Sequence, residues 1–146
     1  KSAYRLAKNP LFSNSPGATW TQSANQCVIR EDVFVFLQQL RTLSVEVDKI
    51  ALLYPNPWPK SCHLQRRWHG HSVFPWLCQL ANSIELRTNW SVYADEFEQS
   101  AAFFSATTER FTCTTCTPMT RFEDKYRRHG VPIYGVMANF TASETM

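Results

Sequence analysis

The stretch VDKIALLYPNPWPKSCHLQRRW, Val47 to Trp68, joins an apolar segment, a proline-rich turn and a basic segment. Its apolar residues do not alternate with polar ones, which predicts a strand at 47–54 buried on both faces, as in a parallel sheet. Three prolines then fix the backbone just beyond this strand. We expect Asn56 and Trp58 to face a ligand there and the basic residues to bind phosphate, although such a turn also ends strands without any ligand.

The flanking patterns predict an alternating order of strands and helices, which is typical of an α/β fold. A strand at 25–32 ends in acidic residues, and Asp32 is a suitable N-cap for a helix at 33–43. Ser72 is a suitable cap for a second helix, and a third helix begins at about Ser91 after a strand at 83–89. The predicted inner faces are Val33, Phe36, Leu37 and Leu40; Val73, Trp76, Leu77 and Leu80; and Tyr93, Phe97, Ala101 and Phe104.

The end of the chain predicts an antiparallel pair that closes the sheet. The segments ERFTCTTCT and VPIYGVMANF are rich in β-forming residues, and a polar loop, TRFEDKYRRHG, separates them. Phe34, Phe36, Phe97, Phe103 and Phe104 are best explained as core residues.

Composition limits the class of protein. With 146 residues and 44% hydrophobic content the chain has room for one domain with a real core. It has no apolar run of about 18 residues and no signal-peptide pattern, so we expect a soluble cytoplasmic protein without membrane contact. Five cysteines without framework spacing fit a reducing compartment, and a net charge of +3 permits an anionic partner without requiring one.

Polar clusters follow three of the predicted strands. They are Glu31 with Asp32, Asn56 with Trp58, and Thr88 with Asn89. In open α/β sheets the ligand lies at the carboxyl ends of the strands, so these clusters mark the expected site.

Three segments together resemble the bacterial tRNA (guanine-N7)-methyltransferases. YPNPWPKSCHLQRRW is similar to their PDPWxKxxHxKRR signature, RTNWSVYADEF to their TDWxxYAxxM segment, and TRFEDKYRRHG to their TxFExxxxxxG segment. The order and approximate spacing agree, and the resemblance covers nearly all of the chain from Asp32 onward. It implies a class I S-adenosylmethionine-dependent methyltransferase, with a Rossmann-like sheet, a final antiparallel strand and tRNA as partner.

The sequence departs from this family in two ways. Its four glycines contain no GxGxG, so we expect residues 1–146 to be the C-terminal two-thirds of one methyltransferase domain, without the first strands and the glycine-rich cofactor loop. We expect this segment alone to be inactive. The second departure is that Asn56 and Asn89 replace the Asp residues of PDPW and TDW.

The resemblance assigns roles residue by residue. Asn56 stands at the catalytic, cofactor-contacting position, and Asp32 or Glu31 would contact the adenine side of S-adenosylmethionine. The tRNA-contacting positions are Lys60, the run from Cys62 to Arg67 with His63, Arg66 and Arg67, then Asn89, Thr120, Arg121, Phe122 and Glu123.

The expected reaction is methylation of guanine N7. Its in-plane lone pair attacks a sulfonium methyl group without a general base, so positioning and electrostatics supply the catalysis. An amide lacks the full charge of a carboxylate, and its donor and acceptor pair naturally with adenine. Two alternatives to a guanine-N7 enzyme therefore remain. One is a methyltransferase for exocyclic amines, and the other is an RNA-binding paralogue without activity.

Several of these residues also fit purely structural roles. Arg66 and Arg67 have the pattern of solvated surface cations, and Trp58 that of an aromatic side chain packed against the sheet. Cys113 and Cys116 form a lone CxxC, which buried strand cysteines explain better than zinc or a redox site, and we expect no metal. We expect a monomer.

Overall fold

The structure is a computed structural model of the chain, which describes residues 19–22, 27–113 and 117–140. The chain forms two compact units, Lys1–Val47 and Asp48–Met146. Each unit is described by itself.

Among its described residues, the first unit contains a short hairpin and one helix. Strand β1 (Thr19–Gln22) pairs antiparallel with β2 (Cys27–Arg30). Helix α3 (Val33–Thr42) begins where predicted, because one carboxylate oxygen of Asp32 accepts from the backbone N–H groups of Phe34 and Val35 at 2.9 and 3.2 Å. Leu37 and Leu40 are buried as expected, whereas Val33 is 39% exposed, so the inner face is narrower than predicted.

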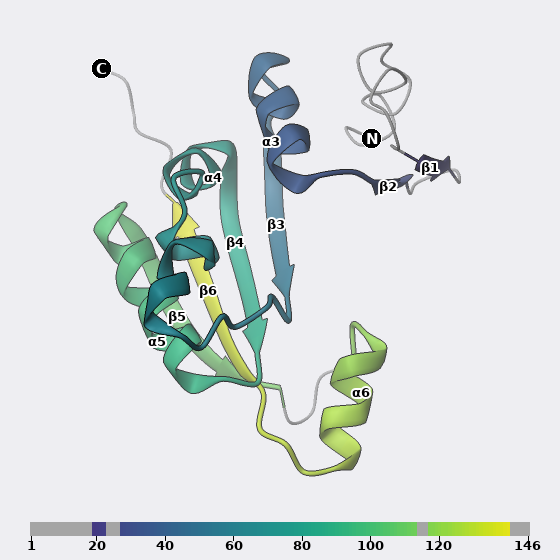
Figure 1. Ribbon diagram of the computed structural model, residues 1–146, viewed down its shortest axis with the longest axis vertical. Coiled ribbons are helices and arrows are strands. Elements are labelled where there is room, and N and C mark those ends of the chain that lie inside the picture. Colours follow the sequence, from purple (N-terminus) through teal and green to yellow (C-terminus); the bar gives the residue numbers. More distant parts are fainter. Residues whose placement is uncertain (1–18, 23–26, 114–116, 141–146) are drawn as a thin grey trace. The chain divides into compact units, whose positions relative to one another are not determined.

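The second unit is built on a four-stranded mixed sheet in the order β3-β4-β6-β5. The strands are β3 (Val47–Leu53), β4 (Ala81–Thr88), β5 (Ala106–Thr112) and β6 (Tyr134–Phe140). Strands β3 and β4 point the same way (Figure 1), and β6 runs antiparallel to both of its neighbours, with Val136 opposite Leu86 on one side and Arg110 on the other. The predicted α/β class and the final antiparallel strand are therefore confirmed.

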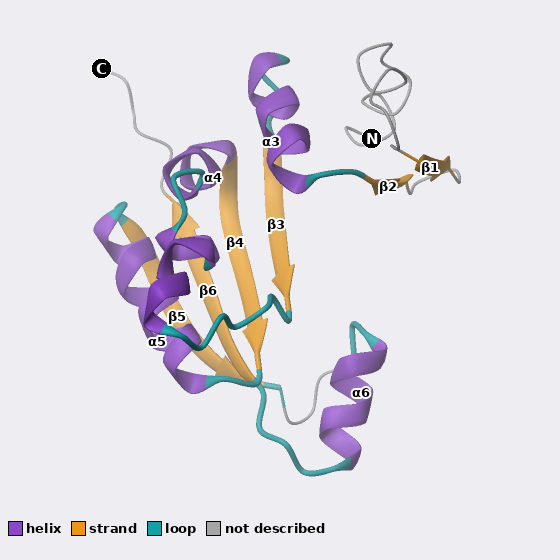
Figure 2. Ribbon diagram, in the orientation of Figure 1, coloured by secondary structure: helices purple, strands orange, loops and turns teal. Residues whose placement is uncertain are grey.

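Two helices cover one face of this sheet (Figure 2). After β3 come two 3₁₀ turns, η1 (Ser61–Arg66) and η2 (Trp68–Gly70), and helix α4 (Phe74–Leu80), while α5 (Ser91–Phe103) connects β4 with β5. Both crossovers return on the same side, as the right-handed rule for parallel strands requires. The fully buried residues of this layer include Phe74, Leu77, Ile84, Leu86, Tyr93, Ala94, Phe97, Ala101, Val136 and Ala138.

The prediction for β3 was wrong in one respect. Of its seven residues only Leu52 is buried, and Ala51 is exposed. The reason is position, because β3 is the edge strand of the described sheet and has a neighbour on one side only.

Helix α4 begins later than predicted and has a different inner face. Ser72 does not cap it; Val73 occupies the N-cap position, and its backbone N–H donates to Nδ1 of His71 at 3.1 Å. The inner residues are Phe74, Leu77 and Cys78, and Trp76 is 39% exposed. The helix starts one residue further on, and its buried stripe is displaced by one position along the sequence, away from Trp76.

The segment predicted as a polar loop contains helix α6 (Arg121–Arg128). Thr120 caps it, since its Oγ1 accepts from the backbone N–H of Glu123 at 3.1 Å. Gly130, with φ +65°, follows the helix in the left-handed conformation that favours glycine. The sequence carried a signal for this helix, because Thr-x-x-Glu is the capping-box pattern.

The prediction of a phenylalanine core was partly wrong. Phe97 is fully buried, but Phe34 is 38% and Phe103 is 83% exposed. Among the helices that the structure describes, none is long and apolar enough to cross a membrane.

Candidate functional site

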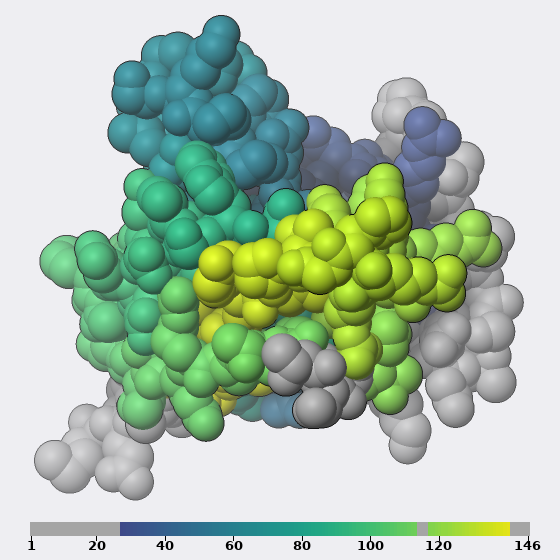
Figure 3. Space-filling view, turned by 90° about the horizontal axis from the view of Figure 1, so that it is seen from below, coloured from purple at the N-terminus to yellow at the C-terminus, as the bar shows by residue number. Residues whose placement is uncertain are grey.

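The carboxyl ends of β3 and β4 are joined directly. The backbone N–H of Tyr54 donates to the carbonyl oxygen of Arg87 at 2.8 Å, just where both strands end. The turn after β3, the start of α5 and helix α6 all lie at this end of the unit, onto which Figure 3 looks. The three segments that carry the family resemblance therefore lie at one end of the sheet, next to the carboxyl ends of β3 and β4.

The proline-rich turn holds Asn56 outward. Tyr54 and Trp58 both have positive φ angles, 51° and 44°, which side chains other than glycine seldom adopt. Oδ1 of Asn56 accepts from the backbone N–H of Trp58 at 3.3 Å and so closes the turn on itself. The Asn56 side chain is exposed.

Arg67 fastens this turn to α5 from inside. It is 3% exposed, and its Nε and Nη2 donate to the carbonyl oxygen of Trp58 at 3.2 and 3.0 Å. Its Nη1 pairs with Glu96 of α5, and the guanidinium lies 5.0 Å from the centre of the Trp90 ring. Arg67 is thus occupied by the protein itself, in contrast with the surface position expected for a phosphate contact.

The other cations of the basic segment are accessible. Lys60 and Arg66 are exposed and His63 is half-buried. The Trp58 ring packs edge-on against His63, with centroids 5.4 Å apart, and the Arg66 guanidinium lies 4.8 Å from its centre. Trp58 therefore supports the basic segment by packing.

Glu96 and His69 extend the Arg67 contact. Glu96 Oε2 lies 2.8 Å from His69 Nε2. Burial opposes ionisation of Glu96, but hydrogen bonds from Arg67 and His69 outweigh it and hold the pKa of this carboxyl below its usual range. Burial lowers the pKa of His69, and this effect exceeds that of Glu96, which raises it. The pKa is therefore below its usual value, and the imidazole is neutral at pH 7.

A chain of buried charges ties α6 to the sheet. Glu123 is fully buried; its Oε1 accepts from Arg87 Nη1 at 2.6 Å and its Oε2 from the backbone N–H of Met119 at 2.7 Å. Arg87 also donates from Nε to Glu85 at 2.6 Å, and Glu85 pairs with Lys49. Burial opposes ionisation of Glu85, yet the bonds from Lys49 and Arg87 keep its pKa below the usual range.

The remaining predicted contact residues differ in accessibility. Asn89 is exposed directly after β4, where Thr88 Oγ1 accepts from the backbone N–H of Trp90 at 3.1 Å. Arg121 and Phe122 are exposed in the first turn of α6, with Phe122 62% exposed. Glu123 is fully buried, so guanine would reach its carboxylate only after a movement of α6.

Glu31 and Asp32, the acidic pair of the first unit, make different contacts. Asp32 is engaged as the cap of α3, while Glu31 Oε1 accepts from the backbone N–H of Asp32 at 2.9 Å. Glu31 Oε2 is buried and has no hydrogen-bond partner within the part of the chain that the structure describes. Of the two carboxylates, Glu31 therefore has the acceptor that a cofactor hydroxyl or amino group would need.

Sequence reasoning missed the residues that hold the site together, namely Glu85, Arg87 and Glu96. Charged residues inside a strand or helix suggested only solvated faces. A signal for the first two was present, because Glu85 and Arg87 lie two apart on one face of a strand whose other face is apolar. Cys113 is buried, and Cys116 lies outside the described residues.

The comparisons with known proteins identify the family. A family model described as "Putative methyltransferase" matches residues 18–136. The chain belongs to this methyltransferase family. It is 26% identical over 125 residues to a tRNA (guanine-N(7)-)-methyltransferase of Nitrosomonas europaea, covering 81% of this chain and 55% of that protein. It is 33% identical over 100 residues to a protein of the same name from Rhizobium meliloti, covering 60% of this chain and 42% of that protein.

The chain spans about half the length of the curated relatives that it matches. The family resemblance predicted from its three motif segments is confirmed by the family match.

Proposed function

We propose that the protein takes part in S-adenosylmethionine-dependent methylation of guanine N7 in tRNA. The observation that supports this most is that the three motif segments meet at one end of the sheet. The contacts that join them are Tyr54 with Arg87, Arg67 with Glu96, and Arg87 with Glu123. Relatives named for this activity match 81% and 60% of the chain at 26% and 33% identity, which favours the proposal.

The residues present suit the cofactor that the family implies. Asn56, exposed at the end of β3, would contact it. When bound, S-adenosylmethionine supplies a methyl group on a positively charged sulfur, which an unprotonated ring nitrogen can take without a general base.

The residues of this chain would then bind and orient the guanine. Asn89 is exposed directly after β4, and its amide oxygen is an acceptor for the N1–H or 2-amino group of guanine. Oδ1 of Asn56, which accepts from the backbone N–H of Trp58, would lie beside the positive charge that grows on the ring. Lys60 and Arg66 would neutralise tRNA phosphates and fix the register of the RNA. Arg67 would hold the turn that carries Asn56.

The geometry of Asn56 favours guanine N7 over an exocyclic amine. A methyltransferase for amines needs the amide oxygen to accept from the target amino group, and here that oxygen already accepts from the backbone N–H of Trp58. Trp58, which would stack on such a base, packs against His63 and Arg66.

The direct test is to incubate the full-length protein with S-adenosylmethionine and tRNA and to analyse the released nucleosides by mass spectrometry. We expect 7-methylguanosine above the level in a control without cofactor. A methylated exocyclic amine would overturn the guanine assignment. Absence of any methylated nucleoside, with cofactor and tRNA both bound, would make the protein an RNA-binding paralogue.

A further inference from the structure

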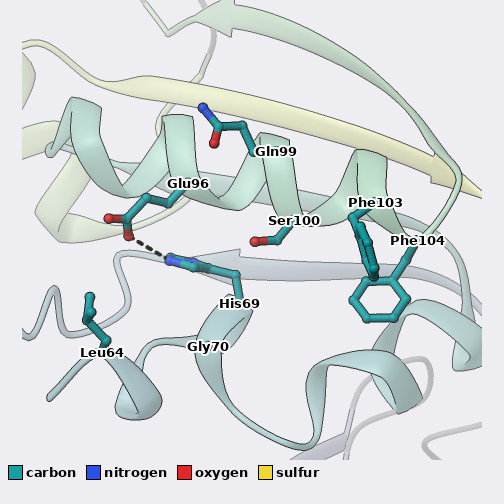
Figure 4. Close-up of a pocket in the computed structure, with 8 residues that line it drawn as sticks. All are labelled: Leu64, His69, Gly70, Glu96, Gln99, Ser100, Phe103 and Phe104. Atoms are coloured by element: carbon teal, nitrogen blue, oxygen red, sulfur yellow. Dashed lines mark hydrogen bonds and ion pairs between the residues drawn. The ribbon is translucent and has the colours of Figure 1, made fainter.

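A groove lies beside the basic segment, between the two 3₁₀ turns and the C-terminal half of α5. It consists of two hollows of about 550 and 640 Å³, which share His69, Gly70 and Phe104 and so form one continuous depression. Figure 4 shows the first hollow, with His69 reaching to Glu96 and with Phe103 and Phe104 together at one end. Each volume falls in the range of small-ligand sites.

We propose that this groove binds an unstacked nucleoside of the RNA that the basic segment holds. The proposal rests on the proposed function for its partner, tRNA, and adds to it a second place of contact outside the methyl-transfer site.

The aromatic residues of the groove offer a stacking surface. Phe103 is 83% exposed, and its ring meets Phe104 edge-on at a centroid distance of 5.3 Å. Leu64, which is 44% exposed, lines the same hollow as Phe103, so the two side chains give it an apolar surface of the kind that binding grooves have. Proteins that hold single-stranded RNA place aromatic rings in this way, because every base has a face on which a ring can stack.

The floor of the groove carries an unused acceptor. Glu96 accepts from His69 Nε2, and the neutral imidazole therefore carries its proton on Nε2 and a lone pair on Nδ1. The His69 side chain is 7% exposed, and Nδ1 has no hydrogen-bond partner among the described residues. Buried polar atoms nearly always have a partner, and because Nδ1 itself is not exposed, an amino or hydroxyl group of a nucleoside would bond to it through a water.

The walls favour a nucleoside over an apolar protein side chain. Gln99 and Ser100 line the first hollow and supply both hydrogen-bond donors and acceptors, as a base edge requires. Arg66 lines the second hollow, and Lys60 and His63 belong to the same stretch of chain. A phosphate at Arg66 would place the adjoining nucleoside over the groove.

The test uses the full-length protein and tRNA, because Phe103 is exposed and its replacement leaves the fold intact. We expect Phe103→Ala to weaken tRNA binding by about 5- to 20-fold, the loss typical of one stacked base, with the salt dependence of binding unchanged. Phe103→Trp keeps a stacking face and should bind within about twofold of wild type. Ala102→Ser, at the neighbouring exposed position, serves as a mock substitution.

Photo-crosslinking gives a readout independent of methylation. With tRNA carrying 4-thiouridine, we expect a crosslinked peptide that contains Phe103 or Phe104. Binding of Phe103→Ala within about twofold of wild type, while Arg66→Ala binds less tightly, would overturn the groove proposal and leave the proposed function in place. A crosslink and a weaker Phe103→Ala variant in a protein that forms no 7-methylguanosine would support the groove and overturn the proposed function. If the wild type binds no tRNA, both fail.

Discussion

Arg67 donates two hydrogen bonds to the carbonyl oxygen of Trp58, from Nε at 3.2 Å and from Nη2 at 3.0 Å. The donors of a guanidinium lie in one rigid plane. The two hydrogen bonds from Arg67 therefore fix both the orientation of the proline-rich turn and its distance from α5. Through Glu96 and Trp90 the same side chain joins the first two motif segments. The turn that carries Asn56 is therefore positioned by a buried cation.

Replacing Arg67 should destabilise the protein far more than replacing its neighbour. Arg67→Ala removes three hydrogen bonds and leaves Glu96 without its main partner, which we expect to cost about 3 kcal/mol in the free energy of unfolding. Arg66→Ala removes an exposed cation that packs on Trp58 and should cost less than about 1 kcal/mol. Urea denaturation of both variants measures this difference, and equal losses would contradict it.

The exposed cations should determine how RNA binding depends on salt. Lys60→Ala and Arg66→Ala should each weaken tRNA binding and reduce the slope of log affinity against log salt by about 0.7 to 0.9, as expected for one lost phosphate contact. Filter binding of tRNA over a range of KCl concentrations gives the slopes. Unchanged slopes in both variants would mean that these are ordinary surface charges.

Two adjacent carboxylates of α6 should behave differently. Glu123→Gln weakens the buried bond to Arg87 and should cost about 2 to 4 kcal/mol, with faster hydrogen exchange at the start of α6. Asp124→Asn breaks only the 2.8 Å surface pair with Arg128 and should cost less than about 0.5 kcal/mol. Thermal unfolding and amide exchange distinguish the two, and an unaffected Glu123→Gln variant would refute the anchoring role of this carboxylate.

Gly135 should tolerate no side chain while Phe111 is present. Gly135 pairs with both Arg87 and Phe111 across the sheet, and a Cβ at position 135 would overlap with the Phe111 ring. Gly135→Ala should therefore cost about 1 to 3 kcal/mol in stability. Combined with Phe111→Leu, it should cost less than the sum of the two single changes, because the smaller side chain relieves the clash. Additive losses in this double-mutant cycle would contradict the explanation.

Restoring the two carboxylates tests the chemistry of the site. Asn56→Asp with Asn89→Asp should raise methyl transfer to guanine N7 by about thirty- to several-hundred-fold, because a carboxylate beside the developing positive charge is worth about 2 to 4 kcal/mol. Both positions are exposed, and a carboxylate at position 56 can still accept from the backbone N–H of Trp58.

The measurement is 7-methylguanosine formation per unit time in wild type and double variant, with cofactor and tRNA binding determined separately. Loss of an existing activity in the double variant would indicate that the amides recognise a base with an amino group, since a carboxylate has no donor.

The sequence by itself determined most of the elements and their order. Apolar spacing predicted α3 and α5, Asp32 predicted the start of α3, and the two β-rich segments predicted the antiparallel pair of β5 and β6. These features depend only on residues close together in sequence. The hydrogen bonds of an N-cap join residues two or three apart, and the spacing of apolar residues indicates which face of a helix is buried. The order and spacing of the three motif segments also predicted the protein family.

Only the tertiary structure decided which charges are buried. Arg66 and Arg67 are adjacent residues of the same type, yet Arg66 is exposed and Arg67 is buried. Arg67 is buried because the fold places Glu96 and the Trp58 carbonyl oxygen within hydrogen-bond distance of it. Glu123 likewise became a buried partner of Arg87, and β3 became an edge strand. Burial of a charge depends on a partner distant in sequence that compensates for its lost hydration, so local pattern alone does not determine it.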